Sequence, residues 1–150
     1  DAEAYYNRGT AYHKKGLYDE AIEDYTKAIQ INPKDAEAYY NRGTAYHKKG
    51  LYGKAIEDYT KAIKINPKLA GVYSNRGRAY SEKGLYDDAI EDFTKAIELD
   101  QNYTGDYLIR GAVYYMKGLR NEAISDFKKA ADLGDKRARK NLKEIFNIDY

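Results

Sequence analysis

An internal repeat of 34 residues constrains this chain more than any other feature. Segments 1–34 and 35–68 are identical at 31 of 34 positions and differ only at Asp19/Gly53, Glu20/Lys54 and Gln30/Lys64. Two more diverged copies follow at 69–102 and 103–136, and a tail of residues 137–150 completes the chain. A fixed period of this length predicts a solenoid made from one supersecondary unit, and all four units with the tail form a single domain of 150 residues.

Each copy contains two helical patterns. The first covers about Ala2–Lys15 and ends at Gly16, where cationic residues and a glycine are typical of a helix end. The second begins near Asp19 and Glu20 and carries apolar residues three and four positions apart. It ends before Pro33, because proline disfavours helical geometry at the preceding residue. The chain is therefore expected to be all-α, with about nine helices.

A single hairpin of this size cannot bury a sufficient core, so neighbouring units must stack. A glycine recurs in the middle of each first helix, although it costs about 1 kcal/mol there relative to alanine. These glycines are Gly9, Gly43, Gly77 and Gly111. The repetition of that cost indicates a close approach of the second helix, with Ala21, Ala55, Ala89 and Ala123 facing the glycines.

An arginine stands beside each of these glycines, and an aspartate follows it 16 residues later. The pairs are Arg8 with Asp24, Arg42 with Asp58, Arg76 with Asp92 and Arg110 with Asp126. We predict that each pair joins the two helices of its unit. The alternative is that both side chains are solvated surface charges.

Taken together, these positions resemble the tetratricopeptide repeat (TPR) family over residues 2–136. Unit one carries the marks as Tyr5, Gly9, Tyr12, Ala21, Tyr25, Ala28 and Pro33, and the other units repeat most of them. The first ring is Tyr where the family usually has Trp, and Arg precedes the glycine where the family usually has Leu. The resemblance implies a right-handed α-solenoid of helix–turn–helix hairpins.

The tail is interpreted as a capping helix. Ala138, Leu142, Ile145 and Phe146 form one apolar stripe, and several basic residues face away from it. A nucleic-acid patch is the alternative, but no aromatic residue is interleaved to stack on bases.

Composition argues against several function classes. The 26 basic and 24 acidic residues nearly cancel, which gives no case for nucleic acid or a membrane surface as partner. There is no cysteine and no apolar run of about 20 residues, so neither a thiolate site nor membrane insertion is expected. No glycine-rich phosphate loop occurs, and acidic pairs recur with the repeat, as solvated side chains do. The chain is therefore expected to be non-catalytic, without a cofactor and soluble, with the cytoplasm slightly favoured and its compartment open.

His13 and His47 are the only histidines and occupy equivalent places in adjacent units. They could share a metal ion, but two ligands are too few for a structural site, so no metal is expected.

The resemblance places the first helices along a concave groove, and its candidate partner-binding residues follow from that. They are Glu3, Tyr6, Asn7, Thr10, His13 and Lys14; Glu37, Tyr40, Asn41, Thr44, His47 and Lys48; Ser74, Asn75, Arg78, Ser81 and Glu82; and Leu108, Ile109, Ala112, Tyr115 and Met116.

Three asparagines of this set, Asn7, Asn41 and Asn75, form a ladder whose amides could donate to and accept from a peptide backbone. Alternatively they are solvated or hold helices together. The end of the groove formed by unit four is apolar, through Leu108, Ile109, Tyr115 and Met116. That end could bind the partner, be covered by the capping helix, or dock the rest of a longer protein.

Members of the family that bind chaperone tails use a basic clamp for a terminal carboxylate. Their pattern has Lys at position 6, Asn at positions 10 and 41, Lys at position 71 and Arg at position 75. This chain has Tyr6, Thr10, Asn41, Gly71 and Asn75 at those positions, so only Asn41 matches. A carboxylate clamp is therefore not expected.

Three functions remain in view. The first is a protein-interaction module that binds a peptide or partner segment in the groove. The second is a self-associating solenoid or an engineered repeat array, since near-identical units could stack end to end or exchange hairpins. The third is a targeting domain of a larger enzyme, because the chain begins at Asp1 without Met and suggests a mature, excised or engineered fragment.

Overall fold

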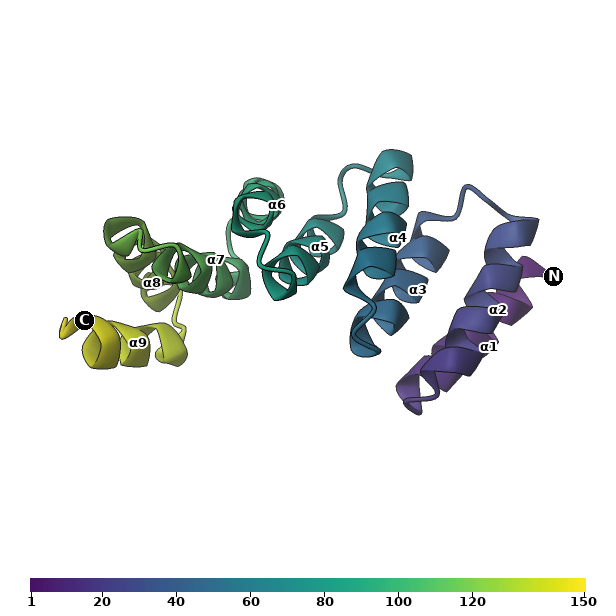
Figure 1. The fold of residues 1–150 in the computed structure, drawn as a ribbon, viewed down its shortest axis with the longest axis horizontal. Coiled ribbons are helices and arrows are strands. Elements are labelled where there is room, and N and C mark those ends of the chain that lie inside the picture. Colours follow the sequence, from purple (N-terminus) through teal and green to yellow (C-terminus); the bar gives the residue numbers. More distant parts are fainter.

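The computed structural model describes residues 1–150 as nine helices without a strand, which confirms the all-α prediction. The helices are α1 (Ala2–Lys14), α2 (Tyr18–Ile31), α3 (Ala36–Lys48), α4 (Tyr52–Ile65), α5 (Ala70–Glu82), α6 (Tyr86–Leu99), α7 (Thr104–Met116), α8 (Arg120–Asp132) and α9 (Lys136–Phe146). They follow one another along an elongated molecule whose termini lie at opposite ends (Figure 1). None of the helices combines the length and the apolar character that a membrane span requires.

The helix boundaries follow local chemistry. Gly16 takes a φ of 76°, a left-handed geometry that glycine adopts without strain, directly after the end of α1. The second helix starts at Tyr18, slightly earlier than predicted, so Asp19 and Glu20 lie within its first turn, where they complement the helix dipole. Asn32 ends α2 with φ −128° and ψ 88°, the extended geometry that a following proline favours.

Each unit packs its two helices together, and its second helix packs against the first helix of the next unit. The central rings of the second helices are almost completely buried: Tyr25, Tyr59, Phe93 and Phe127. The predicted close approach at the mid-helix glycines is confirmed, since a Cβ at Gly43 would lie 2.9 Å from Cε1 of Tyr59. The atoms nearest to such a Cβ belong to the Tyr59 ring, whereas the sequence predicted that Ala55, four residues earlier, faces the glycine. In the third unit the alanine also comes close, since a Cβ at Gly77 would lie 3.3 Å from the backbone oxygen of Ala89.

The predicted arginine–aspartate pairs are confirmed in all four units. Arg42 donates from Nε and Nη2 to the two carboxylate oxygens of Asp58, at 2.8 and 2.9 Å. The corresponding N–O distances are 2.6 and 2.8 Å for Arg8, 2.7 and 2.8 Å for Arg76, and 2.8 and 2.8 Å for Arg110. This two-pronged geometry is the strong form of the pair and fixes how each hairpin closes.

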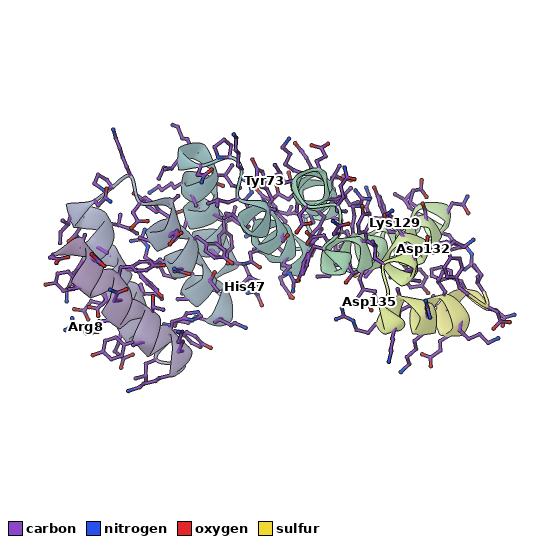
Figure 2. The ribbon with its side chains drawn as sticks, turned by 180° about the vertical axis from the view of Figure 1, so that it is seen from behind. Arg8, His47, Tyr73, Lys129, Asp132 and Asp135 are labelled. Carbon is purple, nitrogen blue, oxygen red and sulfur yellow. The ribbon has the colours of Figure 1, made fainter.

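Sequence analysis missed a third contact of these arginines, which joins successive units. Nη1 of Arg42 donates to Oγ1 of Thr26 in the preceding unit at 2.9 Å, and Arg76 and Arg110 repeat the contact. Arg8 lies in the first hairpin (Figure 2) and has no preceding unit, and its side chain is 55% exposed, whereas that of Arg42 is 13% exposed.

The tail forms the predicted cap, with one correction. Ala138, Leu142 and Phe146 are buried against the last hairpin, but Ile145 is 39% exposed. The buried residues are spaced four apart, and Ile145 is turned about 100° from Phe146 around the helix axis. The helix ends at Phe146, so the last four residues of the predicted cap lie outside it.

Asp58→Ala tests the inter-helix pair. It leaves the buried Arg42 guanidinium without its carboxylate, so we expect a loss of about 3 kcal/mol in the free energy of unfolding, measured by denaturant titration. Asp24→Ala is the matched control, because Arg8 can return to water, and its loss should be clearly smaller. Equal losses would show that burial of the arginine does not set the cost.

Gly53→Asp tests the start of α4. No acidic residue lies in its first turn, and a Cβ at Gly53 meets no atom within 4 Å. The substitution should therefore stabilise the protein by roughly 0.5–1 kcal/mol, through lower unfolded-state entropy and the helix dipole. Lys64→Gln is another reversion in that helix, but it lies far from this turn and should change little. A lower melting temperature for Gly53→Asp would refute the interpretation.

Candidate functional site

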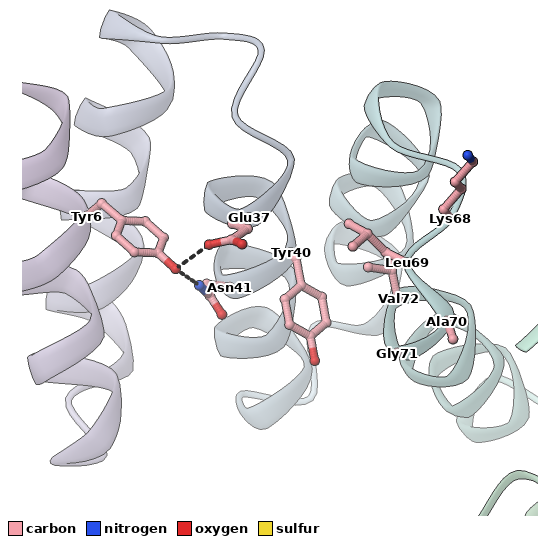
Figure 3. Close-up of a pocket in the computed structure, with 9 residues that line it drawn as sticks. All are labelled: Tyr6, Glu37, Tyr40, Asn41, Lys68, Leu69, Ala70, Gly71 and Val72. Atoms are coloured by element: carbon pink, nitrogen blue, oxygen red, sulfur yellow. Dashed lines mark hydrogen bonds between the residues drawn. The ribbon is translucent and has the colours of Figure 1, made fainter. Parts of the chain in front are cut away.

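Two adjoining hollows lie along the first helices of the repeats. The larger, of about 410 Å³, is lined by Tyr6, Glu37, Tyr40, Asn41, Lys68, Leu69, Ala70, Gly71 and Val72 (Figure 3). The smaller, of about 270 Å³, is lined by Tyr40, Ala70, Gly71, Ser74, Asn75, Arg78, Asp100, Tyr103 and Asp106. Because they share Tyr40, Ala70 and Gly71, they form one continuous surface across α1, α3, α5 and α7, which we call the groove.

Tyrosine–asparagine bonds between consecutive first helices order the groove. Asn41 Nδ2 donates to the hydroxyl of Tyr6 at 2.8 Å, and this hydroxyl donates to Oε2 of Glu37 at 3.2 Å (Figure 3). Asn75 Nδ2 donates to the hydroxyl of Tyr40, also at 2.8 Å. Burial, followed by the charge of Glu37, raises the pKa of Tyr6. The asparagines therefore hold helices together through their nitrogens, while their amide oxygens keep their acceptor capacity.

A deeper layer supports these residues. The hydroxyl of the buried Tyr25 donates to Oγ1 of Thr10 at 3.2 Å, and Thr10 in turn donates to the backbone carbonyl of Tyr6 at 3.0 Å. Tyr59 and Thr44 repeat the arrangement in the second unit, at 3.3 Å. Thr10 and Thr44 are therefore committed to contacts within the protein.

The two histidines are held separately against neighbouring rings. His13 packs edge-on against Tyr18 with ring centroids 5.3 Å apart, and His47 does the same with Tyr52 at 5.1 Å. Both Nε2 atoms are buried without a hydrogen-bond partner. Burial lowers the pKa of both imidazoles, and Lys48 adds to this effect, whereas Glu82 opposes it at His47. No group of three or more potential metal-ligating side chains occurs in the chain.

The apolar end of the predicted surface is partly covered by the cap. The ring of Tyr115 packs edge-on against Phe146, with centroids 5.6 Å apart, and Leu108 packs against the same cluster. Ile109 packs against the buried Phe93, while Met116 remains 54% exposed. Of these four side chains, Tyr115 therefore contacts the cap helix directly, as one of the alternatives proposed.

The groove contains only part of the residue set expected from the sequence. It brings together Tyr6, Glu37, Tyr40, Asn41, Ser74, Asn75 and Arg78. It does not include Glu3, Asn7, Thr10, His13, Lys14, Thr44, His47, Lys48, Ser81, Glu82, Leu108, Ile109, Ala112, Tyr115 or Met116.

Sequence analysis missed the segment 68–72 and three residues of the smaller hollow, Asp100, Tyr103 and Asp106. One signal was available, because Asp106 stands where the preceding units have Val72 and Ala38, both buried apolar residues. A charge at a buried repeat position marks a departure from the architecture.

This fold, a stack of helical hairpins with a groove along the first helices, defines a class of repeat scaffold. The chain belongs to the tetratricopeptide repeat family. A family profile described as TPR repeat matches residues 9–50, and one described as tetratricopeptide repeat matches 36–69 and 70–103. Its fold is therefore the α-solenoid that the resemblance implied, and scaffolds of this kind typically serve protein–protein interaction.

Solved structures of the family superimpose closely on the chain. A crystal structure of MamA is 34% identical, with a TM-score of 0.88, and the alignment covers 92% of this chain and 81% of that one. MamA from Desulfovibrio magneticus RS-1 is 26% identical, with a TM-score of 0.85 and coverage of 89% and 75%. The first TPR domain of Spaghetti (RPAP3), bound to the HSP90 peptide SRMEEVD, is 27% identical, with a TM-score of 0.77 and coverage of 78% and 93%. A comparison with curated protein sequences gives no match.

The histidines predict an acid-sensitive fold. Their pKa lies below the ordinary 6.5 in the folded protein, so the unfolded chain binds protons more tightly and stability is lost as the pH falls below about 6.5. His13→Gln/His47→Gln should therefore lose less melting temperature than the wild type between about pH 7.5 and about pH 5. Lys34→Gln/Lys68→Gln, in the same two units, should lose as much as the wild type. An unchanged pH dependence in the histidine variant would contradict the assignment.

Proposed function

We propose that the chain is a non-catalytic interaction module that binds an extended peptide segment of a protein partner along the groove. The observation that carries this proposal is the continuity of the two hollows across successive first helices, which gives an elongated binding surface. A helical solenoid with such a surface suits a partner that contacts several units at once.

The amide oxygens of Asn41 and Asn75 are the proposed backbone contacts. Their nitrogens are already engaged by tyrosine hydroxyls, so the side chains are held in place before a partner binds. A contact that is ordered in advance costs less conformational entropy on binding. Each oxygen would accept an N–H of the partner's backbone, which holds an extended segment with little dependence on its sequence.

The peptide complex of the Spaghetti domain supports a peptide as the class of partner. The positions of the family's basic clamp carry other residues in this chain, since Tyr6, Thr10, Gly71 and Asn75 replace its Lys, Asn, Lys and Arg. We therefore do not propose a terminal carboxylate as the bound group. An internal stretch of a partner fits the groove better.

A random-peptide display selection on the immobilised chain tests this function. We expect a convergent motif on the wild type, and its enrichment should fall by about tenfold on Asn41→Ala/Asn75→Ala, because hydrogen bonds to the backbone are lost. Gln30→Ala/Asn121→Ala is the matched control, since it removes two exposed amides on second helices and should leave the enrichment unchanged.

Two outcomes would contradict the proposal. A motif retained by the groove variant would place the binding site elsewhere. No enrichment on the folded wild type would remove the support for peptide binding, and a mass that rises with concentration would then favour the self-associating solenoid.

A further inference from the structure

Most residues of the smaller hollow depart from the repeat pattern. Three of these substitutions carry the argument: Ser74 stands in the place of Tyr6 and Tyr40, Arg78 in the place of Thr10 and Thr44, and Asp106 in the place of Ala38 and Val72. All three line the same hollow. Three substitutions that change size or charge therefore meet in one site.

The first departure opens the space. In the earlier units a tyrosine reaches across to the asparagine of the next first helix, and Ser74 is too short to do so. Gly71 leaves the adjacent wall open, since a Cβ there meets no atom within 4 Å. On the opposite wall the ring of Tyr103 covers Gly105, where a Cβ would lie 2.8 Å from Cε1 of the tyrosine.

The second feature is a buried acceptor without a partner. Asp106 is 1% exposed, and its Oδ2 accepts a hydrogen bond from Oγ of Ser74 at 2.9 Å. Its Oδ1 has no hydrogen-bond partner, and neither has Nε of Arg78. No ion pair forms between the two residues. Burial raises the pKa of Asp106 and the charge of Asp100 adds to this, while Ser74 and Arg78 oppose it. Leaving a buried acceptor unsatisfied is costly.

The charges of the hollow do not balance. Asp100 and Asp106 carry two negative charges, and Arg78 carries the only positive one. The amide oxygen of Asn75 adds another acceptor. The hollow therefore has an excess of acceptors and of negative charge, and its complement is a cation that carries N–H donors.

We propose that the smaller hollow is a specificity pocket for a basic side chain, lysine or arginine, of the bound peptide. The cationic head donates to Oδ1 of Asp106, and its aliphatic stem passes between Tyr40 and Tyr103, whose rings also attract a cation. This inference rests on the proposed function, because the basic residue belongs to the segment that lies in the groove.

The display selection tests the pocket when it is repeated on Asp106→Asn. This variant keeps the shape and the contact with Ser74 but removes the negative charge. We expect a basic residue at a fixed place in the wild-type motif and about a tenfold lower enrichment of that residue on Asp106→Asn. Glu57→Gln, which removes an exposed carboxylate from α4, is the control and should keep the preference.

A second measurement separates the pocket from the proposed function. Titration of the protein with Nα-acetyl-lysinamide, followed by amide chemical shifts, should perturb α5 and α7 in the wild type and not in Asp106→Asn. Nα-acetyl-norleucinamide and Nα-acetyl-glutaminamide serve as uncharged probes. A selected motif without a basic residue, or with one that Asp106→Asn retains, overturns the pocket and leaves peptide binding intact. Lysinamide shifts at α5 and α7 without any selected peptide support the pocket and contradict the proposed function.

Variants of Arg78 and Asp106 also test whether these two residues serve only each other. Asp106→Ala restores the residue type of Ala38, so it should unfold at the same or a higher temperature than the wild type while losing the lysinamide shifts. Arg78→Gln removes the competing cation and should strengthen lysinamide binding. A lower melting temperature in both variants, with unchanged lysinamide binding in Arg78→Gln, would show an internal charge pair and overturn the proposal.

Discussion

The guanidinium of Arg42 joins three helices, and the arrangement of the solenoid depends on this kind of contact. Two of its nitrogens bind Asp58 in the same hairpin, and the third donates to Thr26 of the preceding one. A buried cation is tolerated only when its donors are satisfied. The rings of Tyr39 and Tyr46 lie 5.7 and 5.9 Å from its central carbon and cover it further. Stacking a second unit therefore completes the hydrogen bonds of the buried arginine as well as an apolar core. The direction of the guanidinium group fixes the register between units.

That register determines what the first helices present to a partner. With each hairpin fixed relative to the last, the hydroxyl of Tyr6 meets the amide of Asn41, and Tyr40 meets Asn75 in the same way. These bonds would break if one unit shifted by even a few ångströms relative to the next, because a hydrogen bond weakens steeply with distance and angle. The order of the groove is therefore a consequence of the arginine contacts beneath it, and the two layers share the same repeat period.

Features repeated in every unit were predictable from the sequence, because the period itself reports a shared environment. The helices, the close glycine and the pairing of Arg42 with Asp58 belong to this group. Contacts between unlike units were not predictable in the same way. The period does not show which oxygen of the preceding unit lies beside Arg42, so Thr26 was missed. Ile145 was misplaced because the tail has no repeat against which its buried face could be checked. For a related reason, the period does not distinguish the first-helix residues that line the two hollows from one such as His47, whose ring packs against Tyr52.

Breaks in the period carry different information from the period itself. The earlier units show that a small apolar side chain satisfies the position of Asp106, so the carboxylate there is unfavourable for folding. Burial raises the pKa of Asp106, which means that the ionised carboxylate is less favourable in the folded protein than in the unfolded chain. A bound cation would stabilise the charged form and, through it, the folded state, in proportion to the logarithm of ligand concentration over its dissociation constant. Folding and recognition are then coupled at a single residue. The same reasoning separates two parts of the groove: the repeated tyrosine–asparagine pairs follow the period and are suited to the backbone of a partner, while Asp106 departs from it and is suited to a particular side chain.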